Sequence, residues 1–262
     1  MKLKIFILFA SLCCFSTAFG QNVEKTLQKS YQKWSQEEAL KIISSKPFAD
    51  QYQSSSGMNA IAQQQQAREQ ADTFLGGNQR GRTIDGVRTV TPIVIRLHSA
   101  LPVRQAQVRL RQIQAGYDKM NGEERKKFDE SQKIMLECAI CKDYYVVTIT
   151  KFTDSSGTSV DNGIFQLMKF EDFKGKIWLV NDKDEKRELA QFTPPKKAGE
   201  PAVFYFKRTD EKGNLLLTTD SKTLKFVFSN DLLDDDNQYS YLLPRTFEFS
   251  VSKLIFNNKV EF

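Results

Sequence analysis

Short segments of alternating apolar and polar residues fill the second half of the chain, and they limit its fold more than any other feature. Phe247, Phe249 and Val251 alternate with polar residues. Because successive strand residues point to opposite faces, this pattern predicts a strand with one buried and one wet face. Similar segments are residues 176–180, 189–192, 202–208, 215–218 and 224–228. Repeated short strands of this kind favour an antiparallel sandwich or a curled sheet over residues 157–262.

Aromatic residues are frequent, with 20 Phe and 8 Tyr, and one cluster of them has two interpretations. Phe204, Tyr205 and Phe206 can form a face that stacks on carbohydrate or binds protein. Neighbouring strand residues point to opposite sides, however, so at least one side of the cluster is expected in the core. We favour the core interpretation.

Residues 87–156 predict a strand-helix-helix-strand unit. Residues 90–97 are rich in β-branched side chains, and Pro92 near their start is typical of an edge strand. In the first helix, apolar residues recur at spacings of three and four and predict one core-facing stripe, while the arginines point elsewhere. The stripe is Val103, Ala106, Leu110 and Ile113, and the arginines are Arg104 and Arg111.

The second helix of this unit begins after Asn121, a residue that favours helix N-termini. Phe128, Ile134 and Met135 are expected to face inward. Residues 144–152 then form a strand, because they are dense in aromatic and β-branched side chains.

Residues 21–52 predict an N-terminal helical segment. Ser35 and Glu38 have the spacing of a capping box, and Lys46-Pro47 favours the end of the helix. Its apolar side is expected to consist of Ala39, Leu40, Ile42 and Ile43. Residues 53–86 are rich in Ser, Gln and Gly, so they bury too little apolar surface to offset their ordering entropy. We expect a flexible loop there, or a binding loop that folds onto a partner.

Residues 1–20 have the three-part pattern of a cleaved signal peptide. Lys2 and Lys4 give a positive start, residues 5–15 are uncharged and apolar, and small residues precede a cleavage site between Gly20 and Gln21. The apolar run is shorter than the roughly 20 residues that span a bilayer. We therefore expect an exported chain, periplasmic or secreted, with no transmembrane anchor after cleavage.

The charge pattern does not indicate nucleic-acid binding. The formal net charge is +6, to which Lys2 and Lys4 of the expected signal peptide contribute two. Basic and acidic residues are interspersed, whereas a nucleic-acid groove needs a concentrated basic face. We expect no nucleic-acid partner.

Cys138 and Cys141 are the cysteines that remain after the expected cleavage. In an oxidising compartment this pair favours a short-loop disulfide. A redox role needs a stabilised thiolate, commonly where the motif opens a helix, but here the motif closes a helix beside Glu137. A structural zinc site needs four ligands, and this pair with His98 gives three. We expect no metal or cofactor, with thiol-disulfide exchange or metal binding as alternatives.

No catalytic residue is assigned from the sequence. His98 is the one histidine that a serine or cysteine hydrolase could use as a base, and its place at the end of a predicted strand favours a surface or loop residue. Glu171 with Asp172, and the acidic residues 231–237, could serve a carboxylate-based hydrolase or hold calcium. Exposed turns are the simpler interpretation, so a hydrolase stays an alternative.

Several packing and turn motifs occur together in this chain. They are Trp34-Ser35 with Glu38-Ala39, Lys46-Pro47-Phe48-Ala49, Ile95-Arg96 with Ser99-Ala100-Leu101-Pro102-Val103-Arg104, and Cys138 and Cys141 with Tyr144-Tyr145-Val146-Val147. With these motifs the chain resembles a group of uncharacterised exported bacterial proteins over most of its mature length. That group has no assigned activity, so the resemblance implies export and assigns no functional residue.

These observations combine into one expectation. We expect an α+β exported protein with N-terminal helices, the strand-helix-helix-strand unit, and a mainly antiparallel, sandwich-like β portion at the C-terminal end. For function we expect a non-enzymatic binding or scaffold protein of the cell envelope. Its partner is expected to be another envelope protein or a surface component.

Overall fold

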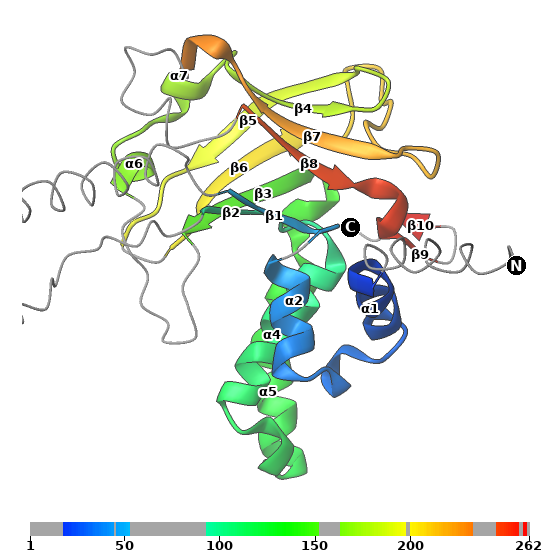
Figure 1. Cartoon of the computed structure of the whole chain (residues 1–262). Coiled ribbons are helices and arrows are strands. Elements are labelled where there is room, and N and C mark those ends of the chain that lie inside the picture. The colour runs from blue at the N-terminus through cyan, green and yellow to red at the C-terminus, as the bar shows by residue number, and fades with distance from the viewer. Residues whose placement is uncertain are drawn as a thin grey trace, which may run out of the picture. The chain divides into compact units, whose positions relative to one another are not determined.

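The computed structural model describes residues 18–44, 46–52, 93–151, 163–197, 200–232, 245–256 and 259–260 of the chain. Backbone contacts divide the chain into two compact units. The first, residues 1–43 and 101–137, is helical in its described part, and the second, residues 44–100 and 138–262, holds the described strands. The predicted α+β class is confirmed (Figure 1).

The helical unit consists of four α-helices and two short 3-10 helices in its described part. They are α1 (Ala18–Leu27), η1 (Tyr31–Lys33), α2 (Gln36–Ser44), α4 (Leu101–Gln114), η2 (Tyr117–Lys119) and α5 (Gly122–Glu137). Helices α4 and α5 pack along one another (Figure 1).

Both predicted helix starts are confirmed. The Ser35 hydroxyl accepts a hydrogen bond from the Glu38 amide at 3.1 Å, and the Glu38 carboxylate accepts one from the Ser35 amide at 2.9 Å. This reciprocal pair is a capping box. The Asn121 side chain accepts hydrogen bonds from the amides of Glu123 and Glu124 at 3.0 Å each. Helix α2 ends at Ser44, before Pro47, as predicted.

The buried face of the helical unit contains more polar side chains than the sequence pattern predicts. Arg104 is 3 % exposed, which corrects the expectation that it points away from the core. Arg109 is also buried and donates from Nε to the Trp34 carbonyl at 2.8 Å. Two residues expected inside are exposed instead, Leu40 at 41 % and Ile134 at 85 %. The sequence pattern therefore identifies the core-facing residues of these helices only in part.

The second unit is built on one eight-stranded antiparallel sheet with the order β1-β2-β3-β6-β5-β4-β7-β8. The strands are β1 (Ala49–Tyr52), β2 (Ile93–Leu97), β3 (Tyr144–Lys151), β4 (Ile177–Asn181), β5 (Lys186–Thr193), β6 (Ala202–Lys207), β7 (Thr223–Phe228) and β8 (Thr246–Ser250). The edge strands β1 and β8 approach each other, so the sheet is curled and nearly closed (Figure 1). Of the two predicted arrangements, the structure has the curled sheet.

Two details of the strand prediction are corrected. Strand β2 pairs with β1 on one side and β3 on the other, so it is not an edge strand. Residues 215–218 form no strand, and Leu215 makes only an isolated bridge with Thr209. A second, two-stranded pairing joins β9 (Ile255–Phe256) and β10 (Lys259–Val260).

One face of the curled sheet, here called the inner face, carries a continuous cluster of phenylalanines. Phe204 lies at its centre, with ring centroids 5.5 Å from Phe173, 5.0 Å from Phe192 and 5.4 Å from Phe226. Phe173 belongs to the short helix α7 (Phe170–Phe173), which follows α6 (Gly163–Gln166). Because these rings fill the inner face, the described part of the sheet encloses a packed core.

Two predicted segments lie partly or wholly outside the described ranges. Residues 1–17 of the expected signal peptide and all of residues 53–86 are not described. Gly20 and Gln21, the expected cleavage pair, lie within α1. In the described ranges, every helix is too short or too polar to cross a membrane.

Candidate functional site

The candidate site is the end of the curled sheet that carries the cysteine pair, here called the disulfide end. It contains the disulfide, η3 (Ala139–Lys142), Tyr145, Arg187, Arg208 and residues 214–217. Each part comes from a segment of the second unit.

Cys138 and Cys141 form a disulfide in the structure, with Cα atoms 5.3 Å apart. It closes η3 between the end of α5 and the start of β3, as the sequence predicts. Cys138 adopts a φ of 40°, a left-handed conformation that is uncommon for residues other than glycine. Both cysteines are buried, at 9 % and 3 % exposure, so their sulfur atoms are poorly accessible to a thiol or a metal ion.

The disulfide covers a small apolar cluster on the outer face of the sheet, opposite the phenylalanines. Val146 is buried against the two cysteines, and Tyr144, Val203 and Tyr205 pack around it while remaining partly exposed. The two tyrosine rings meet edge to face with centroids 6.3 Å apart. The Gln191 side-chain amide donates to the Tyr144 hydroxyl at 3.4 Å. Aromatic rings with polar edges therefore border the disulfide.

Strand geometry divides the cluster Phe204, Tyr205 and Phe206 between the two faces of the sheet. Phe204 and Phe206 are fully buried on the inner face, and Tyr205 lies on the outer face. The predicted core role is confirmed for the two phenylalanines, and Tyr205 retains partly exposed surface.

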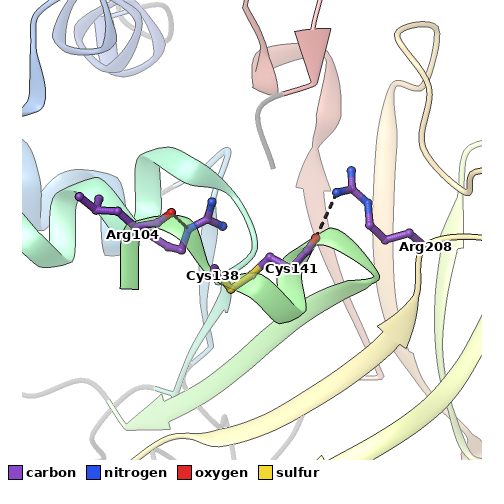
Figure 2. Close-up of a disulfide and its surroundings, with 5 residues drawn as sticks. Arg104, Cys138, Cys141 and Arg208 are labelled. Carbon is purple, nitrogen blue, oxygen red and sulfur yellow. Dashed lines mark hydrogen bonds between the residues drawn. A yellow bond between two sulfur atoms is a disulfide. The ribbon is translucent and has the colours of Figure 1, made fainter. Parts of the chain in front are cut away.

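Arg208 connects the disulfide loop to the inner face. Its guanidinium donates to the Cys141 carbonyl at 3.1 Å, as Figure 2 shows, and lies 5.1 Å above the ring of Tyr145. Its backbone amide donates to the Asp143 carbonyl at 2.9 Å. Arg208 thereby stabilises the loop through neutral carbonyls and a cation–π contact.

Tyr145 is fully buried, and its hydroxyl accepts a hydrogen bond from the Leu217 amide at 3.1 Å. Burial raises the pKa of Tyr145 above its ordinary value, and the positive charges of Arg208 and Arg187 oppose this rise. The phenol consequently stays protonated at neutral pH and lies in the electric field of both arginines.

Residues 214–217 lie at the disulfide end, and their backbone groups form hydrogen bonds with residues of several elements. Arg187 of β5 donates to the Asn214 carbonyl at 2.8 Å, and the Asn181 side chain donates to the Leu216 carbonyl at 2.9 Å. The Leu216 amide donates to the Arg208 carbonyl at 2.9 Å. A turn precedes this segment, with Gly213 at a φ of 84°. The segment is therefore held in one place by directed contacts.

Of the other residues considered from the sequence, His98 lies near this end, because the amide of the following Ser99 donates to the Val146 carbonyl at 3.2 Å. His98 follows β2 directly and is half-buried. Glu171 and Asp172 are exposed on α7, where the Asp172 carboxylate accepts a hydrogen bond from the Lys169 amide at 2.7 Å. No group of three or more metal-ligating side chains gathers within the described ranges. Of the acidic segment 231–237, Asp231 lies in η4 (Asn230–Leu232), and residues 233–237 lie outside the described ranges.

Sequence reasoning missed Arg187, Arg208 and Tyr145. A signal was present, because Arg208 continues the inward alternation of Phe204 and Phe206, and Arg187 precedes the inward Leu189 by two positions. A basic residue at an inward position near a strand end is unusual, since core positions are normally apolar. Chemically, this end offers cationic donors, a buried phenol and an aromatic outer rim.

Comparisons with family models, with curated proteins and with solved structures find no match to this chain.

Proposed function

We propose that the chain is exported, is cleaved between Gly20 and Gln21, and acts as a non-enzymatic binding or scaffold protein of the cell envelope. Its partner is another envelope protein or a surface component, bound at the disulfide end. The export part is supported by the three-part pattern of residues 1–20 and by the resemblance to exported bacterial proteins.

One observation carries the binding part. The partly exposed Tyr144 and Tyr205 border a disulfide-closed loop, on a sheet whose inner face is filled by phenylalanines. Tyrosines offer a large apolar ring and a polar edge at a low cost in side-chain entropy, which is why they are frequent in binding surfaces. The disulfide fixes the loop beside them, so little ordering is needed when a partner binds.

The two alternatives are less well supported. Thiol-disulfide exchange needs an accessible sulfur, whereas both cysteines are buried. A carboxylate-based hydrolase needs two carboxyl groups facing one cleft. Glu171 and Asp172 are adjacent and exposed, and Asp172 serves as a helix cap.

Intact mass of the protein purified from the exported fraction tests the export part. We expect a chain that starts at Gln21 and whose two cysteines react with an alkylating reagent only after reduction. A chain that retains residues 1–20 would contradict export with cleavage. Thiols that react before reduction would support the exchange alternative.

Cosedimentation with the envelope fraction of the producing cells tests the binding part. We expect saturable binding that Tyr144→Ser and Tyr205→Ser each weaken by about fivefold or more, because aromatic anchors dominate binding surfaces. The matched control is Leu167→Ser, which removes a side chain that is 87 % exposed on another part of the same unit. Absence of saturable binding, or equal binding by all three variants, would refute a partner at the disulfide end.

A further inference from the structure

The aromatic residues of the curled sheet differ between its two faces. The inner face carries phenylalanines such as Phe204 and Phe226, which are fully buried. On the outer face, strands β3, β6 and β4 carry Tyr144, Tyr205 and Trp178, which are all partly exposed. Each of these three rings has a polar edge, a hydroxyl or an indole N–H, and such rings suit a surface that is wet on one side. They are therefore able to bind a polar partner.

Trp178 faces outward because its neighbours in β4 face inward. Ile177 and Leu179 are fully buried, and Leu179 pairs with the inner Phe226 of β7. Successive strand residues alternate between faces, so the indole lies on the outer face. The Nζ atom of Lys186 lies 5.9 Å from the centroid of this ring. Lys186 is itself exposed, so a long side chain in contact with solvent covers this face of the indole.

Strand β5 lies between Tyr205 and Trp178 and places two polar side chains between them. Gln191 pairs with Tyr205 and Glu188 pairs with Trp178, so both face outward. Residues three positions apart in a strand normally point to opposite faces, but the register shift between Leu189 and Gln191 brings these two to the same face. Both are exposed. The bulge thereby connects the tyrosines and the tryptophan through polar side chains.

The outward side chains of β5 suit a neutral ligand. Lys186 and Glu188 have opposite charges, and Gln191 is a neutral amide that donates to the Tyr144 hydroxyl at 3.4 Å. An ammonium group donates hydrogen bonds, and carboxylate and amide oxygens accept them. A charged ligand would meet one group of its own sign here, whereas a neutral ligand with many hydroxyl groups can use both.

We propose that the outer-face row, defined as Tyr144, Tyr205 and Trp178 with Gln191 and Glu188 between them, binds a neutral glycan chain. The C–H faces of sugar rings stack on aromatic rings, while sugar hydroxyl groups form hydrogen bonds with the polar side chains. Because the rings come from three different strands, a chain of several sugar units fits the row better than a single sugar. This inference rests on the proposed binding role, names the surface component, and extends its site from the disulfide end to Trp178.

Titration calorimetry of the full mature chain tests the inference. The probes are chitohexaose and cellohexaose, which are neutral glycans, and hexagalacturonic acid, which is an anionic one. We expect saturable binding of at least one neutral probe. No saturable binding of either neutral probe, or tighter binding of the anionic probe, would overturn the inference.

A pair of variants at Trp178 separates stacking from general apolar contact. Trp178→Leu keeps an apolar side chain but removes the ring, so it should weaken binding of the neutral probe by about tenfold or more. Trp178→Phe keeps a ring and should stay within about threefold of the unsubstituted protein. Leu167→Ala, at a residue that is 87 % exposed elsewhere in the same unit, is the control and should leave binding unchanged. Equal binding by the two Trp178 variants would overturn stacking.

Fluorescence of the unsubstituted protein gives a second measurement that needs no variant. The chain has two tryptophans, and Trp34 is 1 % exposed, so added acrylamide quenches mainly Trp178. We expect a saturating neutral probe to reduce this quenching, because a sugar ring on the indole blocks the quencher. Unchanged quenching in the presence of bound probe would refute the outer-face row as the site.

Failure of this inference is distinguishable from failure of the proposed function. Envelope cosedimentation that persists when no neutral probe binds would refute the glycan and leave the proposed function intact. Probe binding that depends on the ring of Trp178, without saturable cosedimentation, would support the glycan site and refute the envelope role alone.

Discussion

The helical unit and the curled sheet are stabilised by different kinds of contact. In the sheet, phenylalanines such as Phe204, Phe206 and Phe226 are fully buried and contact mainly one another. In the helical unit, helix α5 has no fully buried residue, whereas Arg109 and Gln112 of α4 are buried and polar. Apolar burial is non-directional, while a buried hydrogen bond depends on both partners.

The difference determines how each unit responds to substitution. A missing ring in the sheet leaves a cavity, whose cost depends on how far its neighbours can collapse. A missing polar group in the helical unit leaves its partner unsatisfied, which costs the desolvation of that partner. Four substitutions separate these two responses, and they follow in order of expected effect.

Phe204→Ala should destabilise the protein most. The ring lies at the centre of the aromatic cluster and is fully buried, so its loss should lower the free energy of unfolding by about 3–5 kcal/mol. Urea unfolding followed by far-ultraviolet circular dichroism measures the change. Leu167→Ala, on an 87 % exposed residue, is the control, with an effect within about 0.5 kcal/mol. Equal effects of the two variants would contradict an aromatic core.

Arg109→Ala should have the largest effect in the helical unit. Its Nε donates to the Trp34 carbonyl at 2.8 Å, and its terminal nitrogens donate to Asp118 at 3.4 and 3.2 Å. Asp118 is mostly exposed, so its lost contacts matter little. Most of the loss in the free energy of unfolding, about 2–3 kcal/mol, comes from the buried Trp34 carbonyl, which no longer has this donor. The control Arg111→Ala removes an exposed arginine of the same helix. An Arg109→Ala protein as stable as this control would show that α4 does not depend on its buried hydrogen bonds.

Replacing both Cys138 and Cys141 by Ser should cost about 2 kcal/mol, from the loop-closure entropy of a four-residue loop. The disulfide belongs to the second unit, so hydrogen exchange should increase at η3 and the start of β3. Amides of α4 should exchange as before. Unfolding of the unsubstituted protein in a reducing agent should match the double variant. Faster exchange throughout α4 would contradict a local role of the disulfide.

Tyr117→Phe should have the smallest effect, about 1 kcal/mol at pH 7. It removes a hydroxyl that donates to Asp129 at 2.7 Å. Burial, followed by the hydrogen bond and charge of Asp129, raises the pKa of Tyr117 from 10.0 to about 12. Between these values the unfolded chain loses the proton and the folded chain keeps it, so this stabilisation falls as pH rises. The two proteins should therefore converge in stability above pH 10. A constant difference would contradict the raised pKa.

The parts predicted from the sequence are those governed by local patterns. The capping box at Ser35 and the inward Phe247 and Phe249 follow from spacings of a few residues. The order of strands does not, because β3 pairs with β6 across two intervening strands. Long-range pairing depends on the whole inner face, and no short pattern encodes it.

The candidate site divides in the same way. The cysteine pair and its position between helix and strand could be predicted, because spacing and compartment decide it. Strand alternation indicates that Arg187 and Arg208 start on the inner face, but no sequence pattern predicts that they meet at one end, because this depends on which strands become neighbours. Arg104 and Arg109 look like surface residues in the helical pattern, although both are buried, because their burial depends on which segments pack against α4.

The order of the strands also has a consequence for how the chain reaches its final state as it is synthesised. Strands β1 and β2 come from the first hundred residues, yet β1 approaches β8, whose residues 246–250 are made much later. The ribosome therefore synthesises β1 and β2 long before it synthesises β8. The inner face, with its phenylalanines, stays open until β7 and β8 arrive, and an open apolar face aggregates. A holdase chaperone that covers this face until synthesis ends would raise the yield of folded protein.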